Sequence, residues 1–158
     1  MIKFNSNGFR MKTFQFCGLM IFFYLTGCDH GNSSEHLEKT IGFSGNESAQ
    51  SIRQTPDRGF IITGHTNSFR GNYDLYLVKT DDRFNVEWSK IFGTDYFDQG
   101  FDVQLTSDGG FIIVGAISLD RFTSRKIYVI KTDEDGKLLW SRTLGNSYSE
   151  GHSIVELK

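Results

Sequence analysis

The chain has 158 residues, with 17 Lys and Arg against 19 Asp and Glu, a formal net charge of −2 and 38% hydrophobic residues. That length suits one domain of ordinary size, and the apolar content suffices for a core, which excludes wholesale disorder. A nearly neutral charge without a stripe of Lys and Arg excludes a nucleic-acid partner. Two Cys cannot form a disulfide framework, and 17 Gly with one Pro and 15 Phe favour short strands joined by tight turns.

The amino end has the composition of a secretory signal. Residues 1–27 hold three basic residues and no acidic one, and an uncharged apolar run covers residues 16–25. A run of that length is too short to span a bilayer, which takes about 20 residues. A basic start, a short apolar run and a small-residue exit are typical of a signal peptide. We therefore expect residues 1–27 to be removed, with translation starting at Met1 or Met11.

The exit of this segment reads Leu25-Thr26-Gly27-Cys28. It resembles the lipobox of bacterial lipoproteins. The resemblance implies cleavage before Cys28 and a lipid on its sulfur, so the predicted partner of the chain is a membrane, reached through a lipid anchor at Cys28. It places the protein in the bacterial cell envelope, on the periplasmic or the exposed side. Asp29 favours the inner membrane in some lineages of such lipoproteins, so inner and outer membranes both remain open.

After Cys28 the composition changes twice. Loss of three basic residues and no acidic one takes the net charge from −2 to −5. Residues 28–36 are polar and contain Gly and Ser, which predicts a flexible tether. Residues 37–158 are predicted to form the folded domain.

This domain consists of an internal repeat. Residues 55–64 return 51 positions later as residues 106–115, with seven of ten positions identical, and residues 75–81 return 52 positions later as residues 127–133. The extra residue falls in the loop after Gly115. The repeats cover about 43–93 and 94–145, and residues 146–158 begin a partial third copy.

Each repeat predicts four short strands, because runs rich in Val, Ile, Thr and aromatic residues alternate with turn signals. The predicted strands are residues 50–55, 60–66, 74–80 and 86–92 in the first repeat, and residues 101–106, 111–118, 126–132 and 137–144 in the second. The turn at residues 56–59 contains Gly59, which can supply a positive φ. No stretch after the signal segment has helical periodicity, so the predicted fold class is all-β.

A tandem four-stranded unit of this length resembles a β-propeller blade. Residues 133–140 resemble the tryptophan-docking motif of quinoprotein-like propellers, and residues 106–115 resemble repeats of secreted and lipoprotein propellers. The resemblance implies a partial propeller of about two blades, with Trp140 between adjacent blades. Complete propellers have four to eight blades, so two leave sheet edges uncovered. Several chains could self-associate through those edges to complete a ring, two sheets could pack as a small open sandwich, or the chain could be a truncated member of a longer family. Open packing and truncation are favoured over an assembly of several chains.

Carboxylates and histidines are the first candidates for chemistry. Asp81-Asp82 and residues 133–135 could hold Ca²⁺, but hairpin turns also favour Asp and Gly there, and the turn interpretation is favoured. None of His30, His36, His65 and His152 has the spacing of metal ligands. Cys28 is better explained by the lipobox than as a nucleophile. We therefore predict no catalytic residue, no cofactor and no metal.

Aromatic residues and lysines recur at the repeat spacing. The aromatic set could stack on carbohydrate, but repeated aromatics more often form the core between blades. Its members are Phe60, Tyr76, Trp88, Phe111, Tyr128 and Trp140. For Lys79 and Lys131 an ion pair with a turn carboxylate, or plain solvent exposure, suffices.

These observations predict a lipid-anchored envelope protein, not an enzyme, that binds or scaffolds a protein or carbohydrate partner. The first alternative is a fragment of a longer propeller lipoprotein without independent activity. The second is part of a quinoprotein-like enzyme. It is disfavoured because the chain lacks a complete ring of blades and vicinal cysteines.

Overall fold

The computed structural model describes residues 39–42, 44–69, 72–121 and 124–157. The predicted signal peptide, the tether and Cys28 lie outside these ranges. The chain divides into residues 1–42 and residues 43–158, and every strand belongs to the second unit. The described residues contain eight strands and no helix, which confirms the all-β fold class.

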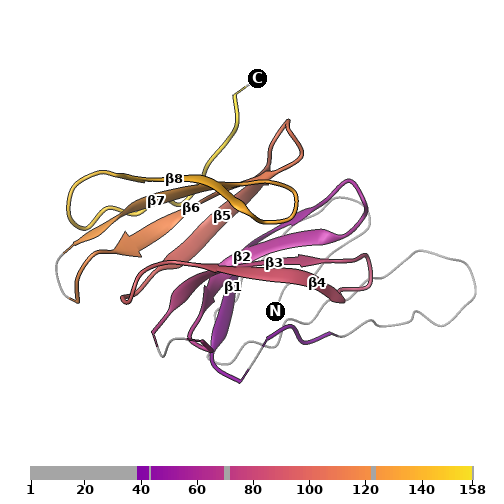
Figure 1. Cartoon of the computed structure of the whole chain (residues 1–158), viewed down its shortest axis with the longest axis horizontal. Helices are drawn as coiled ribbons and strands as arrows, with labels where there is room; N and C mark the ends of the chain where they lie inside the picture. The colour runs from indigo at the N-terminus through magenta and orange to yellow at the C-terminus, as the bar shows by residue number, and fades with distance from the viewer. Residues whose placement is uncertain (1–38, 43, 70–71, 122–123, 158) are drawn as a thin grey trace, which may run out of the picture. The chain divides into compact units, whose positions relative to one another are not determined.

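The strands form two four-stranded antiparallel sheets, each in sequence order, which together form an open arrangement (Figure 1). The first sheet is β1 (Glu47–Gln54), β2 (Phe60–Thr66), β3 (Asp74–Thr80) and β4 (Val86–Phe92). The second sheet is β5 (Gln99–Leu105), β6 (Phe111–Ser118), β7 (Arg125–Thr132) and β8 (Leu138–Leu144). One sheet therefore corresponds to one sequence repeat, as expected of a partial propeller-like array.

Most strand boundaries agree with the sequence prediction, but β1 begins earlier than expected. Glu47, Ser48 and Ala49 already pair with β2, and the register shifts between Ala49 and Ser51. Such a bulge adds a residue to one strand and interrupts the alternation of side chains. The interrupted pattern hid the start of β1, and the start of β5, which has the same shift between Gly100 and Asp102.

The turn between β1 and β2 corrects a second expectation. Arg58 adopts the positive φ, at 72°, and Gly59 does not. Gly59 is required for a different reason, since a Cβ atom there would clash with the backbone carbonyl oxygen of Thr80 and would lie 2.7 Å from the Lys79 Nζ. In the second repeat Gly109 stands at the position of Arg58 and has φ 85°.

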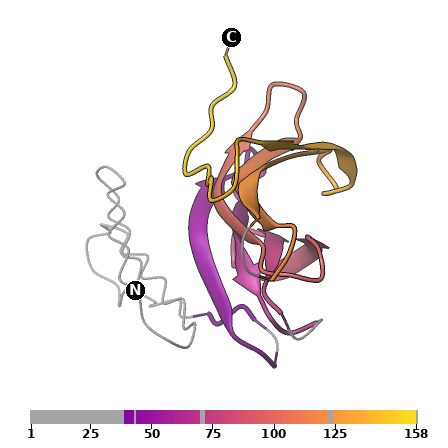
Figure 2. The same ribbon diagram turned by 90° about the vertical axis from the view of Figure 1, so that its left-hand side faces the viewer.

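The two sheets pack face to face through one hydrophobic core, and Figures 1 and 2 show them as successive layers. The first sheet contributes Ile61, Leu75 and Leu77, and the partly buried Trp88 and Phe92 cover the margin of the same core. The second sheet contributes the remaining buried residues, which are Val103, Phe111, Ile113, Ile117, Tyr128 and Ile130. Burying each such side chain stabilises the fold by about 1.5–3 kcal/mol.

Residues after β8 lie on the second sheet as the start of β5 lies on the first. The Gly151 N–H donates to the Gly115 carbonyl at 3.2 Å. Asp102 joins both layers, because its carboxylate accepts from Ser51 on β1 at 2.9 Å and from Ser153 after β8 at 3.4 Å. Ser51, Asp102 and Ser153 are spaced 51 residues apart, so the partial third copy follows the geometry of the first two.

Candidate functional site

Lys79 on β3 is buried and lies at the centre of an ion cluster whose two carboxylates are exposed. Its Nζ donates to Asp57 Oδ2 at 2.7 Å, to Glu87 Oε2 at 2.9 Å and to the Thr80 carbonyl at 3.0 Å. Burial by itself lowers the pKa of Lys79, but the hydrogen bonds to the two carboxylates outweigh it and leave the pKa above its usual value. Its bond to Lys79 in turn lowers the pKa of Asp57 to about 2. Lys79 is therefore held charged in an ion pair with the turn carboxylate of Asp57, as the sequence analysis offered, and is not a plain exposed lysine.

Lys131 repeats this arrangement in the second sheet. Its Nζ donates to Asp108 Oδ1 and to the Thr132 carbonyl, both at 2.9 Å. Hydrogen bonds from Thr106 and Lys131 hold the pKa of Asp108 well below its usual range. Leu139 stands where the first sheet has Glu87, so Lys131 forms an ion pair with one carboxylate only.

A cavity of about 440 Å³ opens at the junction of the two sheets, beside Lys79. Trp88 and Phe111 form its aromatic side, and Glu134 and Asp135 come from the turn before β8. Because Lys79 is already held by its own carboxylates, no cationic group of this lining is free for an anion. The remaining carboxylates make the cavity suited to water or a cation.

Trp88 is the residue that joins one repeat to the next. Its indole lies 6.0 Å from the Phe111 ring, measured between centroids. It also covers Gly136 so closely that a Cβ atom there would fall 2.6 Å from Trp88 Cζ3. The predicted packing of Trp88 between repeats is therefore confirmed, and the turn glycine is the surface that receives it.

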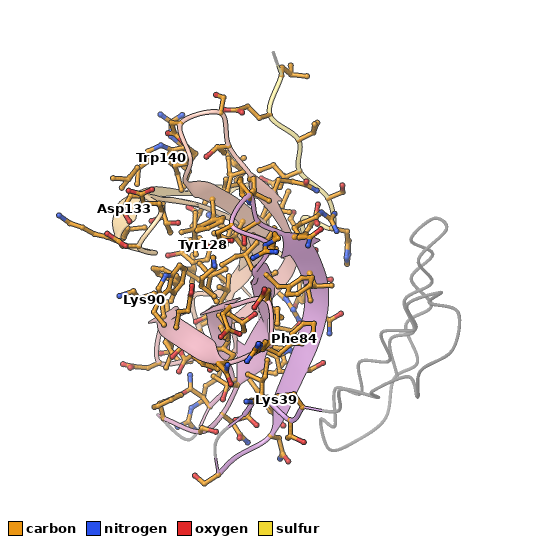
Figure 3. The ribbon with its side chains drawn as sticks, turned by 90° about the vertical axis from the view of Figure 1, so that its right-hand side faces the viewer. Lys39, Phe84, Lys90, Tyr128, Asp133 and Trp140 are labelled. Carbon is orange, nitrogen blue, oxygen red and sulfur yellow. The ribbon has the colours of Figure 1, made fainter. Side chains whose placement is uncertain are left out.

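The same prediction is wrong for Trp140. This residue is 43% exposed on β8 (Figure 3), and Leu144, 51% exposed, lies on the same face of the strand. The Arg142 guanidinium lies 5.6 Å from the Trp140 ring centroid and is its nearest charged neighbour on the strand. Trp140 is exposed because no third sheet lies over it in the part of the chain that the structure describes. The remaining members of the aromatic set, including Tyr76 and Tyr128, are buried as predicted, apart from Phe60, which is half-buried.

Phe84 was not identified from sequence. It has φ 60° at the position where the second repeat has Gly136, and it is fully buried. Its ring stacks on Phe60 at 4.5 Å, while Trp88 packs on Phe111, the repeat equivalent of Phe60. Phe84 therefore fills, in the first sheet, the place that the preceding repeat's tryptophan fills in the second. A comparison of the two turns, with Phe in one and Gly in the other, could have found it.

The first carboxylate of each acidic turn accepts hydrogen bonds from backbone N–H groups of the same turn. Asp81 Oδ1 accepts the N–H groups of Arg83 and Asn85, each at 2.8 Å. Asp133 Oδ1 does the same for Asp135 and Lys137, at 3.1 and 2.8 Å. These bonds support the turn interpretation over a calcium site.

The two histidines with described positions, His65 and His152, are not brought together into one site. His65 is half-buried beside Gln99, whereas His152 is exposed and lies 3.4 Å from a carboxylate oxygen of Glu150. Cys28, His30 and His36 lie outside the described residues. Among the residues with described positions, no group of three or more His, Cys, Asp or Glu could hold a metal ion.

Comparison with protein-family models and with curated proteins finds no match to this chain. In the described ranges no helix has the length and apolarity needed to cross a membrane. The geometry of the chain itself must therefore carry any functional conclusion.

Proposed function

We propose that this chain is a lipid-anchored protein of the bacterial cell envelope with a non-catalytic binding or scaffolding role. The observation that carries the binding role is the exposed strand β8, where Trp140 and Leu144 lie on the same face at the surface. The equivalent residue of the first repeat, Trp88, is partly buried against the core between the sheets. The exposure of Trp140 is therefore a difference between the two repeats. Contiguous exposed apolar side chains are typical of interaction surfaces.

The engagement of the titratable groups supports a non-catalytic role. Lys79 and Lys131 are held in ion pairs, and the turn aspartates accept backbone hydrogen bonds. A general base or a nucleophile needs a free position next to a substrate site. These groups instead stabilise the hairpins of the two sheets, and Asp133 lies in the turn that leads into β8.

The anchor is tested by metabolic labelling with a radioactive fatty acid. We expect label on the full chain and on a Cys17→Ala variant, and none on Cys28→Ala, because only Cys28 lies at the end of the lipobox. Cys17→Ala is the matched control, since it removes the other cysteine of the chain. Equal labelling of the Cys28→Ala variant would overturn the anchor.

The binding role is tested separately with a photoreactive amino acid placed at position 140 in the anchored chain. We expect a discrete cross-linked adduct in living cells, because this position lies in the exposed apolar strand. The control position is Asp82, an exposed turn residue of the first sheet, which should give no discrete adduct. Absence of any adduct at position 140 would contradict the binding role and leave the anchor untouched.

A further inference from the structure

A line of polar contacts joins the first sheet to the residues that follow β8. Gln99, the first residue of β5, places its Nε2 at 3.1 Å from His65 Nδ1 on β2. The Arg125 guanidinium, at the start of β7, donates to Gln99 Oε1 at 2.6 Å. Arg125 Nε also lies 2.9 Å from Glu150 Oε1, in an ion pair. These four residues are therefore coupled in series and form a relay.

The direction of each hydrogen bond in the relay follows from Arg125. A guanidinium only donates, so the Gln99 atom beside it must be the amide oxygen. The Gln99 amide nitrogen then faces His65, and because this nitrogen also only donates, His65 Nδ1 must accept. A histidine that accepts at Nδ1 is neutral and carries its proton on Nε2. The relay thus requires the neutral form of His65.

A proton on His65 Nδ1 would bring two donors face to face. Turning the Gln99 amide over relieves that contact, but it then presents the amide nitrogen to Arg125, which has no acceptor. A hydrogen bond is therefore lost at one link or the other. The new positive charge also repels Arg125, because both groups lie by the Phe97 ring, whose centroid is 5.3 Å from the guanidinium carbon and 6.0 Å from the imidazole centroid.

The uncharged neighbours of His65 offer its Nδ1 no alternative charge. In the sheet it stands opposite Ser48 on β1 and Leu75 on β3, which do not titrate. The Tyr73 ring packs on it edge-on, with 5.0 Å between centroids. The position of His65 is therefore fixed by rings and strands, while its hydrogen bond depends on Gln99.

The acids near this end of the sheets face elsewhere. Glu47 on β1 and Asp74 on β3 both stand opposite Thr66, the next residue of β2, and successive side chains of a strand point to opposite faces. Asp98, on the loop before β5, accepts the Ser118 N–H at 2.8 Å. Within the described ranges, Arg125 is the charged group that acts on His65, and its charge adds to burial in lowering the pKa of His65.

The far end of the relay holds the residues that follow β8. The Ser149 N–H donates to the Arg125 carbonyl at 2.9 Å, and the Glu150 side chain pairs with the guanidinium of the same residue. Residues 153–156 are held separately, by contacts with β5 and with the turn after it. A displacement of Arg125 therefore acts on residues 149–152 first.

We propose that the relay is a pH-sensitive latch, in which protonation of His65 on β2 loosens residues 149–152 from the second sheet. The neutral imidazole closes the latch, because it accepts from Gln99 and leaves the Gln99 oxygen to Arg125. The imidazolium opens it, because it removes one of these bonds and repels the guanidinium. The latch couples the first repeat to the partial third copy. It goes beyond the proposed anchoring and binding roles and depends on neither.

The latch is tested by hydrogen–deuterium exchange of the full chain in a non-ionic detergent, at about pH 7.5 and about pH 5.5. All proteins carry His152→Phe, because a second histidine 3.4 Å from Glu150 would obscure the result. After correction for the intrinsic pH dependence of exchange, protection of residues 149–152 should fall about fivefold at the lower pH, which corresponds to the loss of one hydrogen bond. Protection of β8, which the relay does not contact, should change less.

Variants of Gln99 and His65 separate the latch from general destabilisation by acid. Gln99→Glu keeps the shape of the side chain but presents two acceptors, which serve both Arg125 and a protonated His65, so protection of residues 149–152 should not fall with pH. His65→Phe has no ring nitrogen and should also show no fall. The matched control is Gln50→Glu, the same change at an exposed position of β1, which should keep the fall.

Two results would overturn the latch. One is equal protection of residues 149–152 at both pH values in the background protein. The other is a fall of the same size in Gln99→Glu and Gln50→Glu, since the loosening would then not pass through the relay. The Gln99→Glu comparison decides this even if His65→Phe does not fold. Neither result bears on fatty-acid labelling or on the adduct from position 140, which test the proposed function.

Discussion

Trp88 of the first repeat packs against Gly136 of the second, so closely that a Cβ atom added at position 136 would lie 2.6 Å from the indole Cζ3. The contact joins β4 to the turn before β8 and brings Trp88 onto Phe111. It depends on the absence of a side chain at Gly136, whose φ of +72° is also in the left-handed region. Glycine is therefore favoured at position 136 for two reasons, which are the space that Trp88 needs and the positive φ of the backbone.

Gly136→Ala should separate these two reasons. The left-handed backbone costs an alanine about 1 kcal/mol, and the displacement of Trp88 adds about 1–3 kcal/mol. The control is Gly109→Ala, because Gly109 has φ +85° and open space around its Cβ direction, so it should lose only the first amount. Urea denaturation of both variants measures the difference, and equal losses would show that the contact with Trp88 contributes nothing.

The two tryptophans offer a matched pair of substitutions. Trp88→Ala should lower the free energy of unfolding by about 2–4 kcal/mol, since it removes a partly buried side chain from the core between the sheets. Trp140→Ala should lower the monomer's stability by less than about 1 kcal/mol, because this side chain is 43% exposed.

Thermal or urea denaturation at low protein concentration measures both changes without a contribution from association. Similar losses for Trp88→Ala and Trp140→Ala would mean that Trp140 is covered in solution. In that case the exposed strand described for the second repeat would be wrong.

At Phe84 the Gly variant should not be less stable than the Ala variant, although glycine is normally the less stable of the two in an ordered segment. Phe84→Ala should cost about 3–5 kcal/mol, because the ring is fully buried. Phe84→Gly should be no worse than Phe84→Ala, since glycine relieves the positive φ of 60° that alanine retains. At Phe111, a buried ring of the second sheet and the repeat equivalent of Phe60, the backbone is an ordinary strand, so Phe111→Gly should be less stable than Phe111→Ala by about 1 kcal/mol. The same order at both positions would contradict a buried Phe84 ring held on a backbone of positive φ.

The strands could be read from the sequence because β-branched and aromatic runs end at Asp- and Gly-containing turns, and because each run occurs twice. The pairing of one sheet with one repeat follows from the same pattern. The starts of β1 and β5 could not be read, because bulges at Ala49 and Gly100 interrupt the alternation on which the prediction depends.

The site could be predicted less well, for a physical reason. Trp88 and Trp140 occupy equivalent positions of their repeats, and the presence or absence of a following sheet among the described residues decides which one is packed. Asp102 illustrates a related limit, because its bonds to Ser51 and Ser153 join segments about 50 residues away in each direction. The repeat spacing of these three residues was visible, but their contact depends on how the layers stack.

His65 should give the fold a pH dependence near neutrality. Its Nδ1 lies 3.1 Å from Gln99 Nε2, and its ring packs edge-on against Tyr73, with 5.0 Å between centroids. Burial lowers the pKa of His65 below its usual 6.5, and the positive charge of Arg125 adds to this effect. The unfolded chain therefore takes up a proton near pH 6.5 that the folded chain binds only at lower pH. Stability is complete above pH 6.5 and decreases as the pH falls below it.

The measurement is urea denaturation at about pH 7.5 and about pH 5.5 for the wild type, His65→Phe and His152→Phe. His65→Phe keeps an aromatic ring in the pocket and removes the titration, so its loss between the two pH values should be smaller than that of the wild type. His152→Phe changes an exposed histidine and should behave like the wild type. Burial raises the pKa of Asp98, which opposes the histidine effect on acidification but is common to all three proteins, so it cancels in the comparison. An unchanged pH dependence in His65→Phe would show that His65 is accessible to protons in the folded chain.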